Sequence, residues 1–169
     1  MPNNPFDTGA KVKTLEDLAK IRLDLSRREK TLVLTNGCFD IVHAGHIHLF
    51  REAKSHGDIL IVAVNDDDSV TRLKGSPRPV FPLAERLELL AAISVIDYLV
   101  SFSEDTPRRI VQELLPEVLV KGGDWRPDEV VGRSEVENAG GKVIIVPYLP
   151  GKSTSAILKA IQALAESNQ

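Results

Sequence analysis

Five short runs of apolar residues recur along the chain, and each is apolar at consecutive positions rather than at alternate ones. The runs are TLVLT (31–35), ILIVAVN (59–65), DYLVSF (97–102), VLVKG (118–122) and KVIIVPY (142–148). Unbroken apolar runs of this length are typical of strands that are covered on both faces, as in a parallel sheet. The pattern therefore predicts five buried strands.

Apolar residues at helical spacing fill the intervals between these runs. A first helix is expected from Thr14, whose hydroxyl can cap it, with Leu15, Leu18, Ile21 and Leu25 on one face. Further helices are expected from about residue 43 to 56, over 83–92, 107–115 and 129–139, and over about 153–165. Strands and helices that alternate along one chain predict an α/β fold, a Rossmann-like doubly wound parallel five-stranded sheet with flanking helices.

Length and composition suit a single domain over residues 14–169, preceded by a flexible tail over residues 1–13 that is rich in Asn, Pro and Gly. The formal charge of -3 argues against a nucleic-acid partner. The single cysteine, Cys38, excludes a disulfide framework. No apolar run approaches ~20 residues and the N-terminus has no secretory pattern, so we expect no membrane span and a cytoplasmic location.

Ligands of doubly wound sheets bind at the carboxyl ends of the strands. The segments at those ends are NGCFD (36–40), NDDDS (65–69), SFSED (101–105), KGGDW (121–125) and PYLPGKST (147–154). Four of them carry polar or phosphate-binding residue types, which favours a nucleotide or phosphate site. The G-K-S in the last segment is not a P-loop, because that pattern needs a glycine where Val146 stands.

Three of the four histidines fall within six residues, at His43, His46 and His48. If a helix begins near residue 44, His43 and His46 share a face at its N-terminal end, whereas His48 is turned by about 200° from His46. Two imidazoles beside the free N–H groups of a helix N-terminus favour an anion site, and Gly45 lets a ligand approach the backbone.

Two other interpretations of the histidines stay open at this point. A zinc site would need a further ligand, for which Asp40 and Cys38 are near in sequence. Alternatively, all three histidines lie on the surface of an amphipathic helix without a chemical role.

H-x-G-H (43–46) after a strand and a G-x-F-D turn resembles the cytidylyltransferase-like nucleotidyltransferases. Together with RLKGSPRP, SEDTP, LVKGGDW and a final S-T-S, residues 31–161 are most similar to the heptose-1-phosphate adenylyltransferases. The resemblance implies a single nucleotidyltransferase domain that transfers AMP from ATP to D-glycero-D-manno-heptose 1-phosphate. The products are ADP-heptose, for the lipopolysaccharide inner core, and pyrophosphate.

Two other functions remain open. One is a cytidylyltransferase acting on a phosphorylated alcohol such as glycerol 3-phosphate or phosphoethanolamine. In glycerol-phosphate enzymes of the family an arginine precedes the Ser-Thr pair, and Tyr148 takes its place in this sequence. The other is a non-catalytic module that binds nucleotide or metal.

Roles for individual residues follow from the resemblance and from the chemistry of the side chains. Catalytic roles are expected for His43, His46 and Lys74. Nucleotide binding is expected for Asn36, Gly37, Cys38, Phe39, Gly45, Lys121, Gly122, Gly123, Asp124, Trp125, Ser153, Thr154 and Ser155. Substrate binding is expected for Asp40, Asn65 and Arg78, the last on the loop 75–82 that is a candidate to close over the sugar phosphate. Cys38 is not expected to be a nucleophile, because the implied transfer needs no covalent intermediate.

No metal site built from protein ligands is expected. Mg²⁺ is expected to arrive with ATP, and Asp66 to Asp68 are interpreted as a capped, solvated helix start. Lys152 is a candidate to supply some of the charge of the missing arginine. The family also implies a homodimer. A sugar kinase is fused to this module in some relatives, and since 169 residues leave no room for it, we expect the kinase to be a separate protein.

Overall fold

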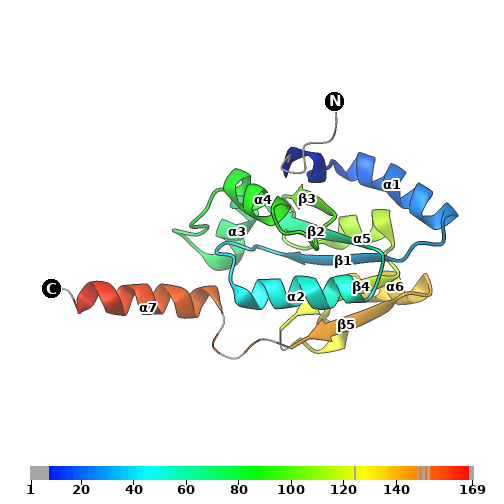
Figure 1. The fold of residues 1–169 in the computed structure, drawn as a ribbon. Coiled ribbons are helices and arrows are strands. Elements are labelled where there is room, and N and C mark those ends of the chain that lie inside the picture. The colour runs from blue at the N-terminus through cyan, green and yellow to red at the C-terminus, as the bar shows by residue number, and fades with distance from the viewer. Residues whose placement is uncertain (1–7, 124, 148, 150, 152, 168–169) are drawn as a thin grey trace.

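One parallel sheet of five strands forms the centre of the fold (Figure 1). The structure is a computed structural model that describes residues 8–123, 125–147, 149, 151 and 153–167. The strands are β1 (Leu32–Gly37), β2 (Ile59–Asn65), β3 (Tyr98–Phe102), β4 (Val118–Gly122) and β5 (Lys142–Val146), in the order β3-β2-β1-β4-β5. All four pairings between neighbours are parallel. The Rossmann-like sheet predicted from the apolar runs is confirmed.

Helices cover both faces of this sheet. The described helices are α1 (Leu15–Arg27), α2 (Ala44–Ser55), α3 (Asp67–Lys74), α4 (Leu83–Ala91), α5 (Arg108–Leu114), α6 (Arg133–Asn138) and α7 (Thr154–Glu166), with 3-10 turns η1 (Thr8–Lys11) and η2 (Pro127–Glu129); α7 is not one of those that cover the sheet. Along β1, Leu32 and Leu34 enter the core beside α1, α5 and α6, whereas Val33 enters the core beside α2 and α4. Burial on both faces explains the unbroken apolar runs. None of the described helices has both the length and the apolar character needed to cross a bilayer.

Residues 8–13 differ from the flexible tail expected over residues 1–13. Val12 forms a parallel bridge with Leu99 of β3, and the N–H of Lys13 donates to the Leu99 carbonyl at 2.9 Å. β3 lies at the edge of the sheet, so its outer backbone groups are available to bind this segment. Composition does not reveal such a contact, because it depends on a strand more than 80 residues further along the chain.

The helix expected over 129–139 is shorter in the structure. η2 ends at Glu129, and α6 begins only at Arg133. Gly132 lies between them with φ of 92°, and a Cβ at this position would come within 2.7 Å of the Val111 side chain. The left-handed conformation interrupts the helix, and a glycine inside a helical pattern does not by itself predict a break.

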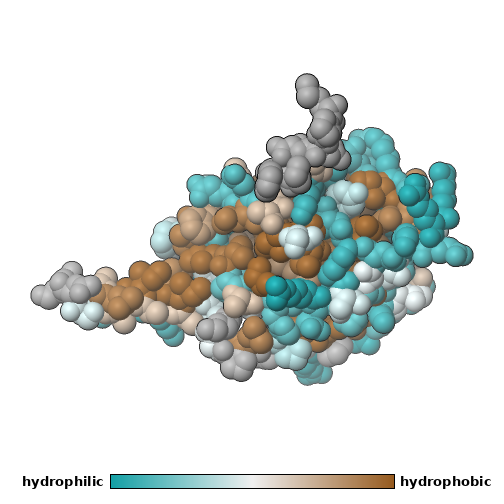
Figure 2. Space-filling model, in the orientation of Figure 1, coloured by the Kyte–Doolittle hydropathy of each residue, from teal (hydrophilic) through white to brown (hydrophobic). Residues whose placement is uncertain are grey.

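Helix α7 stands away from the sheet (Figure 1), and none of its described residues is buried. Figure 2 shows that the exposed side of this helix is largely apolar. Its N-cap is Ser153, whose hydroxyl accepts a hydrogen bond from the N–H of Ala156 at 3.1 Å. The last expected helix is therefore present, with its N-terminal turn close to the end of β5.

Candidate functional site

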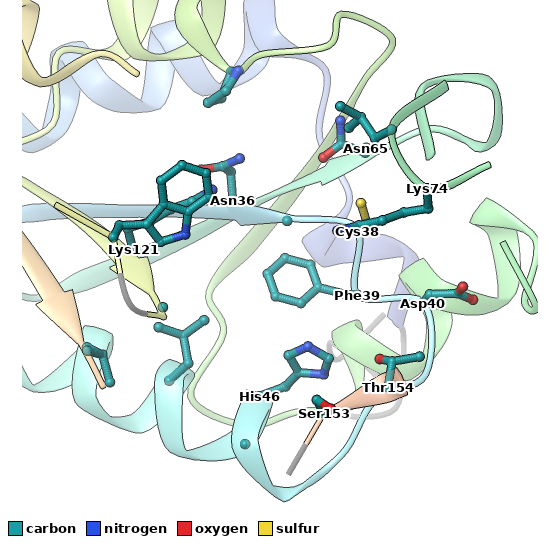
Figure 3. Close-up of a pocket in the computed structure, with 18 of the residues that line it drawn as sticks. Asn36, Cys38, Phe39, Asp40, His46, Asn65, Lys74, Lys121, Ser153 and Thr154 are labelled. Carbon is teal, nitrogen blue, oxygen red and sulfur yellow. The ribbon is translucent and has the colours of Figure 1, made fainter. Parts of the chain in front are cut away.

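A cavity of about 530 Å³ opens at the carboxyl ends of the strands, where the strand order reverses between β1 and β4. Ligands of doubly wound sheets bind at this switch point, because the connections from the two central strands leave in opposite directions. The β1–α2 turn, the ends of β2, β4 and β5, and the first turns of α2 and α7 contribute to its walls (Figure 3).

Among the described residues, the predicted site residues meet in this cavity with one exception, Gly123. Its lining includes Asn36, Gly37, Cys38, Phe39, Asp40, His43, Gly45, His46, Asn65, Lys74, Arg78, Lys121, Gly122, Trp125, Ser153, Thr154 and Ser155. Gly123 is not part of the lining, and its N–H donates to the Val146 carbonyl at 2.9 Å, beside the ends of β4 and β5. Asp124 lies outside the described residues, as do Tyr148 and Lys152. The grouping is thus a structural fact, while the role of each residue stays a prediction.

His43 and His46 form a stacked pair at the start of α2. The helix begins at Ala44, as expected, and His43 is its N-cap residue. The two ring centroids are 3.8 Å apart and the ring planes differ by 21°. His48 is half-buried and does not line the cavity. Helical spacing therefore separates a pair that faces the cavity from a third histidine that does not.

Hydrogen bonding determines which nitrogen of His43 carries the proton. Its Nδ1 accepts a hydrogen bond from the N–H of Gly45 at 3.1 Å. The neutral ring therefore has its proton on Nε2, which is a donor. The Nδ1 of His46 is buried and has no hydrogen-bond partner among the described residues. Because buried polar atoms are nearly always paired in native proteins, this atom is one that a ligand could satisfy.

Both imidazoles are neutral at neutral pH. Burial lowers the pKa of His43, and burial together with the neighbouring His43 lowers the pKa of His46 to about 4. The Phe39 ring meets His46 edge-on at 5.2 Å and adds to its apolar surroundings. A bound anion would raise both pKa values, since a nearby negative charge favours the protonated ring. The pair can thus donate hydrogen bonds to an anion and take up a proton when one binds.

The turn after β1 depends on a close approach between Gly37 and Phe39. A Cβ on Gly37 would come within 2.9 Å of the Phe39 ring, and Phe39 itself has φ of 46°. Burial raises the pKa of the Cys38 thiol between them. A protonated thiol is a weak nucleophile, and the absence of a nucleophilic role for Cys38 stays a prediction.

Lysines reach the cavity from two sides of Cys38 (Figure 3). Lys74 is the last residue of α3, and Lys121 lies on β4. Lys121 donates to Asn36 Oδ1 at 3.2 Å, and its amino group lies 5.4 Å from the centroid of the Trp125 ring. Burial lowers the pKa of Lys121. The two lysines give the cavity local positive charge, although the net charge of the chain is -3.

Arg86 binds the backbone of segments that form the cavity wall, and it was not among the predicted site residues. It is fully buried, and it donates to the carbonyls of Cys38 at 2.6 Å, Asn65 at 2.8 Å and Phe81 at 3.1 Å. It also donates to Asp67 Oδ1 at 2.7 Å. A single guanidinium therefore joins the ends of β1 and β2 to α3 and to the segment before α4. The sequence does contain a sign of this role: Arg86 is a charged residue on the apolar face of a helical pattern, one turn before Leu90.

Asp67 corrects one expectation. Asp66 caps α3 as expected, since its carboxylate accepts from the N–H of Ser69 at 2.8 Å. Asp67, however, pairs with the buried Arg86 and accepts from the N–H of Leu83 at 3.2 Å. The sequence placed it on a solvated helix start because its partners lie 16 and 19 residues further along the chain.

Ten residues that line the cavity were not named as site residues from the sequence. They are Leu49, Leu73, Asp105, Thr106, Pro107, Glu129, Val130, Val131, Val146 and Pro147. Asp105 lies in SFSED (101–105), the segment at the end of β3 that the strand-end rule included, and Thr106 and Pro107 lie in the SEDTP motif of the resemblance, but none of the three was named as a site residue. Within the described part of the chain, no group of three or more His, Cys, Asp or Glu side chains is arranged to hold a metal ion.

A parallel sheet in this order, with a stacked pair of histidines beside a helix N-terminus at its switch point, has the geometry of α/β domains that bind nucleotides. The chain belongs to the cytidylyltransferase-like family, whose model matches residues 34–159.

Similar proteins and solved structures agree with this family membership. The chain is 48% identical over 156 residues to the bifunctional protein HldE of Geotalea uraniireducens, and 52% identical over 136 residues to HldE of Coxiella burnetii. These matches cover 92% and 80% of this chain but 32% and 29% of the relatives, so the chain spans about a third of their length.

Two solved structures have the same fold. A lipopolysaccharide core biosynthesis protein from Thermoplasma volcanium has a TM-score of 0.58 and 34% identity, over 71% of this chain and 97% of that one. A pantoate-beta-alanine ligase from Francisella tularensis has a TM-score of 0.59 at 15% identity, over 85% of this chain and 68% of that one, and is similar in fold alone.

Proposed function

We propose that this protein transfers AMP from ATP to D-glycero-D-manno-heptose 1-phosphate, giving ADP-heptose and pyrophosphate. The observation that carries the proposal is the stacked His43–His46 pair, neutral and at a helix N-terminus, in a cavity that also receives Lys74 and Lys121. The family membership and the kinship to a lipopolysaccharide core biosynthesis protein favour a sugar-phosphate acceptor.

The chemistry needs little from the protein besides position and charge. An oxygen of the sugar phosphate forms a bond to the α-phosphorus of ATP, and the bond from that phosphorus to the bridging oxygen breaks as pyrophosphate leaves. The attacking oxygen is already anionic, so no base has to remove a proton. Donors such as His43 Nε2 and the His46 ring can stabilise the charge that builds up on the bridging and leaving oxygens. Lys74 and Lys121 reduce the repulsion between the two anions.

Mg²⁺ fits this site as an ion that enters with the nucleotide. Two carboxylates of the lining already have cationic partners, Asp40 with Arg78 and Asp105 with Arg72. The protein therefore offers few free oxygen ligands there, which suits an ion held by phosphate oxygens and water. When bound, Mg²⁺ would neutralise part of the triphosphate charge.

Pyrophosphate release tests the proposal directly. The protein is incubated with ATP or CTP, each paired with heptose 1-phosphate, glycerol 3-phosphate or phosphoethanolamine. ATP with the heptose phosphate is expected to give the fastest release, and a clear preference for CTP with an alcohol phosphate would instead support the cytidylyltransferase alternative. Stoichiometric zinc with no release from any pair would support the non-catalytic alternative.

The kinase partner, the oligomeric state and the cellular location of this protein stay predictions. The relatives are named bifunctional, and the matched third of each is one part of such a chain. A separate sugar kinase, a homodimer and a cytoplasmic location are the expectations. Light scattering after size exclusion checks the homodimer, and pyrophosphate release from heptose 1-phosphate without added kinase checks that this chain acts after the phosphorylation step.

A further inference from the structure

The Asp40 carboxylate lies in the wall of the cavity and is only 3% exposed. Its Oδ1 accepts hydrogen bonds from the N–H groups of Val80 at 2.7 Å and Phe81 at 3.1 Å, and its Oδ2 accepts from Arg78 Nε at 2.5 Å. Figure 3 shows the carboxylate pointing away from His46 and Phe39. Three of its roughly four acceptor positions are thus occupied by the loop 75–82.

The same contacts fix Arg78. Its carbonyl accepts from the hydroxyl of Thr71 on α3 at 2.7 Å, and its Nε is held by Asp40. Its side chain is mostly buried and lines the cavity. Among the described residues, its two terminal nitrogens have no hydrogen-bond partner. They are the parallel donors that a guanidinium offers to a phosphate or carboxylate.

We infer that Asp40 is a positioning residue, which holds the loop 75–82 in place and aims the free end of Arg78 at the phosphate of the acceptor substrate. This differs from the direct substrate binding that the sequence analysis expects for Asp40. A carboxylate that already accepts three hydrogen bonds and points away from the histidine pair has little capacity left for a hydroxyl. The identity of the acceptor rests on the proposed function, whereas the state of the loop does not.

The contacts of Asp40 join the β1–α2 turn, which leads to the histidines, to the loop 75–82, where we place the acceptor substrate. Asp40 lies three residues before His43, and the loop that it holds connects Lys74 on α3 to Arg86 on α4. A shift of this loop would move Arg78 while leaving the His43–His46 stack in place. Loss of Asp40 should therefore weaken use of the acceptor more than use of the nucleotide.

Amide hydrogen exchange, resolved by NMR, tests the position of the loop without reference to activity. In Asp40→Ala the N–H groups of Val80 and Phe81 are expected to exchange at least about tenfold faster, because they lose their acceptor. Asp58→Ala is the matched control, since Asp58 also accepts from a backbone N–H, that of Thr31, and pairs with a lysine, away from the cavity. Unchanged exchange at both amides in Asp40→Ala overturns the inference.

Kinetics test whether Asp40 acts through Arg78. Asp40→Ala is expected to raise KM for the sugar phosphate by about tenfold to a hundredfold, with a much smaller change in KM for ATP. The double variant Asp40→Ala/Arg78→Ala is expected to be no worse than Arg78→Ala alone. Effects on kcat/KM that add across the two positions would mean that Asp40 contacts the substrate itself, and would overturn the inference.

A second variant keeps the test decisive if Asp40→Ala does not fold. Asp40→Asn retains the shape and an oxygen for the two amides but loses the charge that pairs with Arg78. Near wild-type exchange with a raised KM for the acceptor is expected, and a wild-type KM overturns the role of the pair. If the wild-type protein transfers nucleotide to no acceptor, the proposed function fails, and the exchange rates still decide whether Asp40 holds the loop.

Discussion

Arg86→Met is the substitution that most directly tests how the cavity is held together. Methionine keeps an unbranched apolar side chain that reaches about as far as the arginine Nε, so the change removes the polar end of the guanidinium and leaves the space of Cζ and the two terminal nitrogens. It takes the donor away from Asp67 and from the carbonyls of Cys38, Asn65 and Phe81.

The expected loss of stability is about 3–5 kcal/mol, because three carbonyls lose a donor and each buried acceptor left unpaired costs about 1–3 kcal/mol. The charge of Asp67 adds little to this loss, since its side chain is 44% exposed and water can solvate it. With a total stability of roughly 5–15 kcal/mol for a domain of this kind, the variant should still fold. Urea unfolding followed by far-UV circular dichroism measures the difference.

Arg28→Met is the control for this experiment. Arg28 pairs with Asp24 four residues earlier, and its side chain is 69% exposed, so a change of at most about 1 kcal/mol is expected. A loss below about 1 kcal/mol for Arg86→Met, or a gain in stability of the kind seen when a buried ion pair is replaced by well-packed apolar groups, would refute the account of Arg86 given above.

Four further outcomes are expected. His46→Ala should lower turnover by about 100-fold to 1000-fold, measured as pyrophosphate release, whereas His48→Ala should change it little; equal effects would contradict the assignment of the pair. The folded pKa of His46 is lowered to about 4 from 6.5, so unfolding takes up a proton between those values and stability should fall by about 2–3 kcal/mol as pH drops from 7 to 4.5. His46→Asn should lack that part of the pH dependence in urea titrations. Because burial raises its thiol pKa, Cys38 should react with iodoacetamide at pH 8 more slowly than free cysteine does, and ATP should slow it further. Gly57→Ala should cost about 1–3 kcal/mol in thermal or urea unfolding, since its Cβ would lie 2.6 Å from the Val33 side chain.

Strong local patterns predicted the strands and most of the helices correctly. The five apolar runs became the five strands, and Thr14 caps α1 by accepting from the N–H of Asp17 at 3.1 Å. Such features depend on residues close together in sequence, which is why periodicity and capping chemistry identify them. The break at Gly132 escaped prediction because the Val111 side chain that crowds this glycine belongs to another helix.

Residue type, element order and helical spacing were also enough to predict which residues lie together at the cavity. Parallel strands bring their carboxyl ends to one edge of a sheet, so the order of strands and helices in the sequence is enough to place the segments after β1, β4 and β5 together. The angle between successive helical residues separated His43 and His46 from His48. These conclusions needed only the order of elements and the geometry of a helix.

The tertiary structure alone decided how the charged groups are paired. Nothing near Asp40 in sequence indicates that it binds the loop that carries Arg78, 38 residues away. Arg86 likewise could not be matched to Asp67 and to three carbonyls from separate segments. Partners distant in sequence meet only when the chain packs, and burial then determines whether a charge contacts a ligand or holds another side chain. The sequence thus located the cavity and its histidine pair, and packing decided that Asp40 binds the loop 75–82 and that Arg86 joins the chain segments around the cavity.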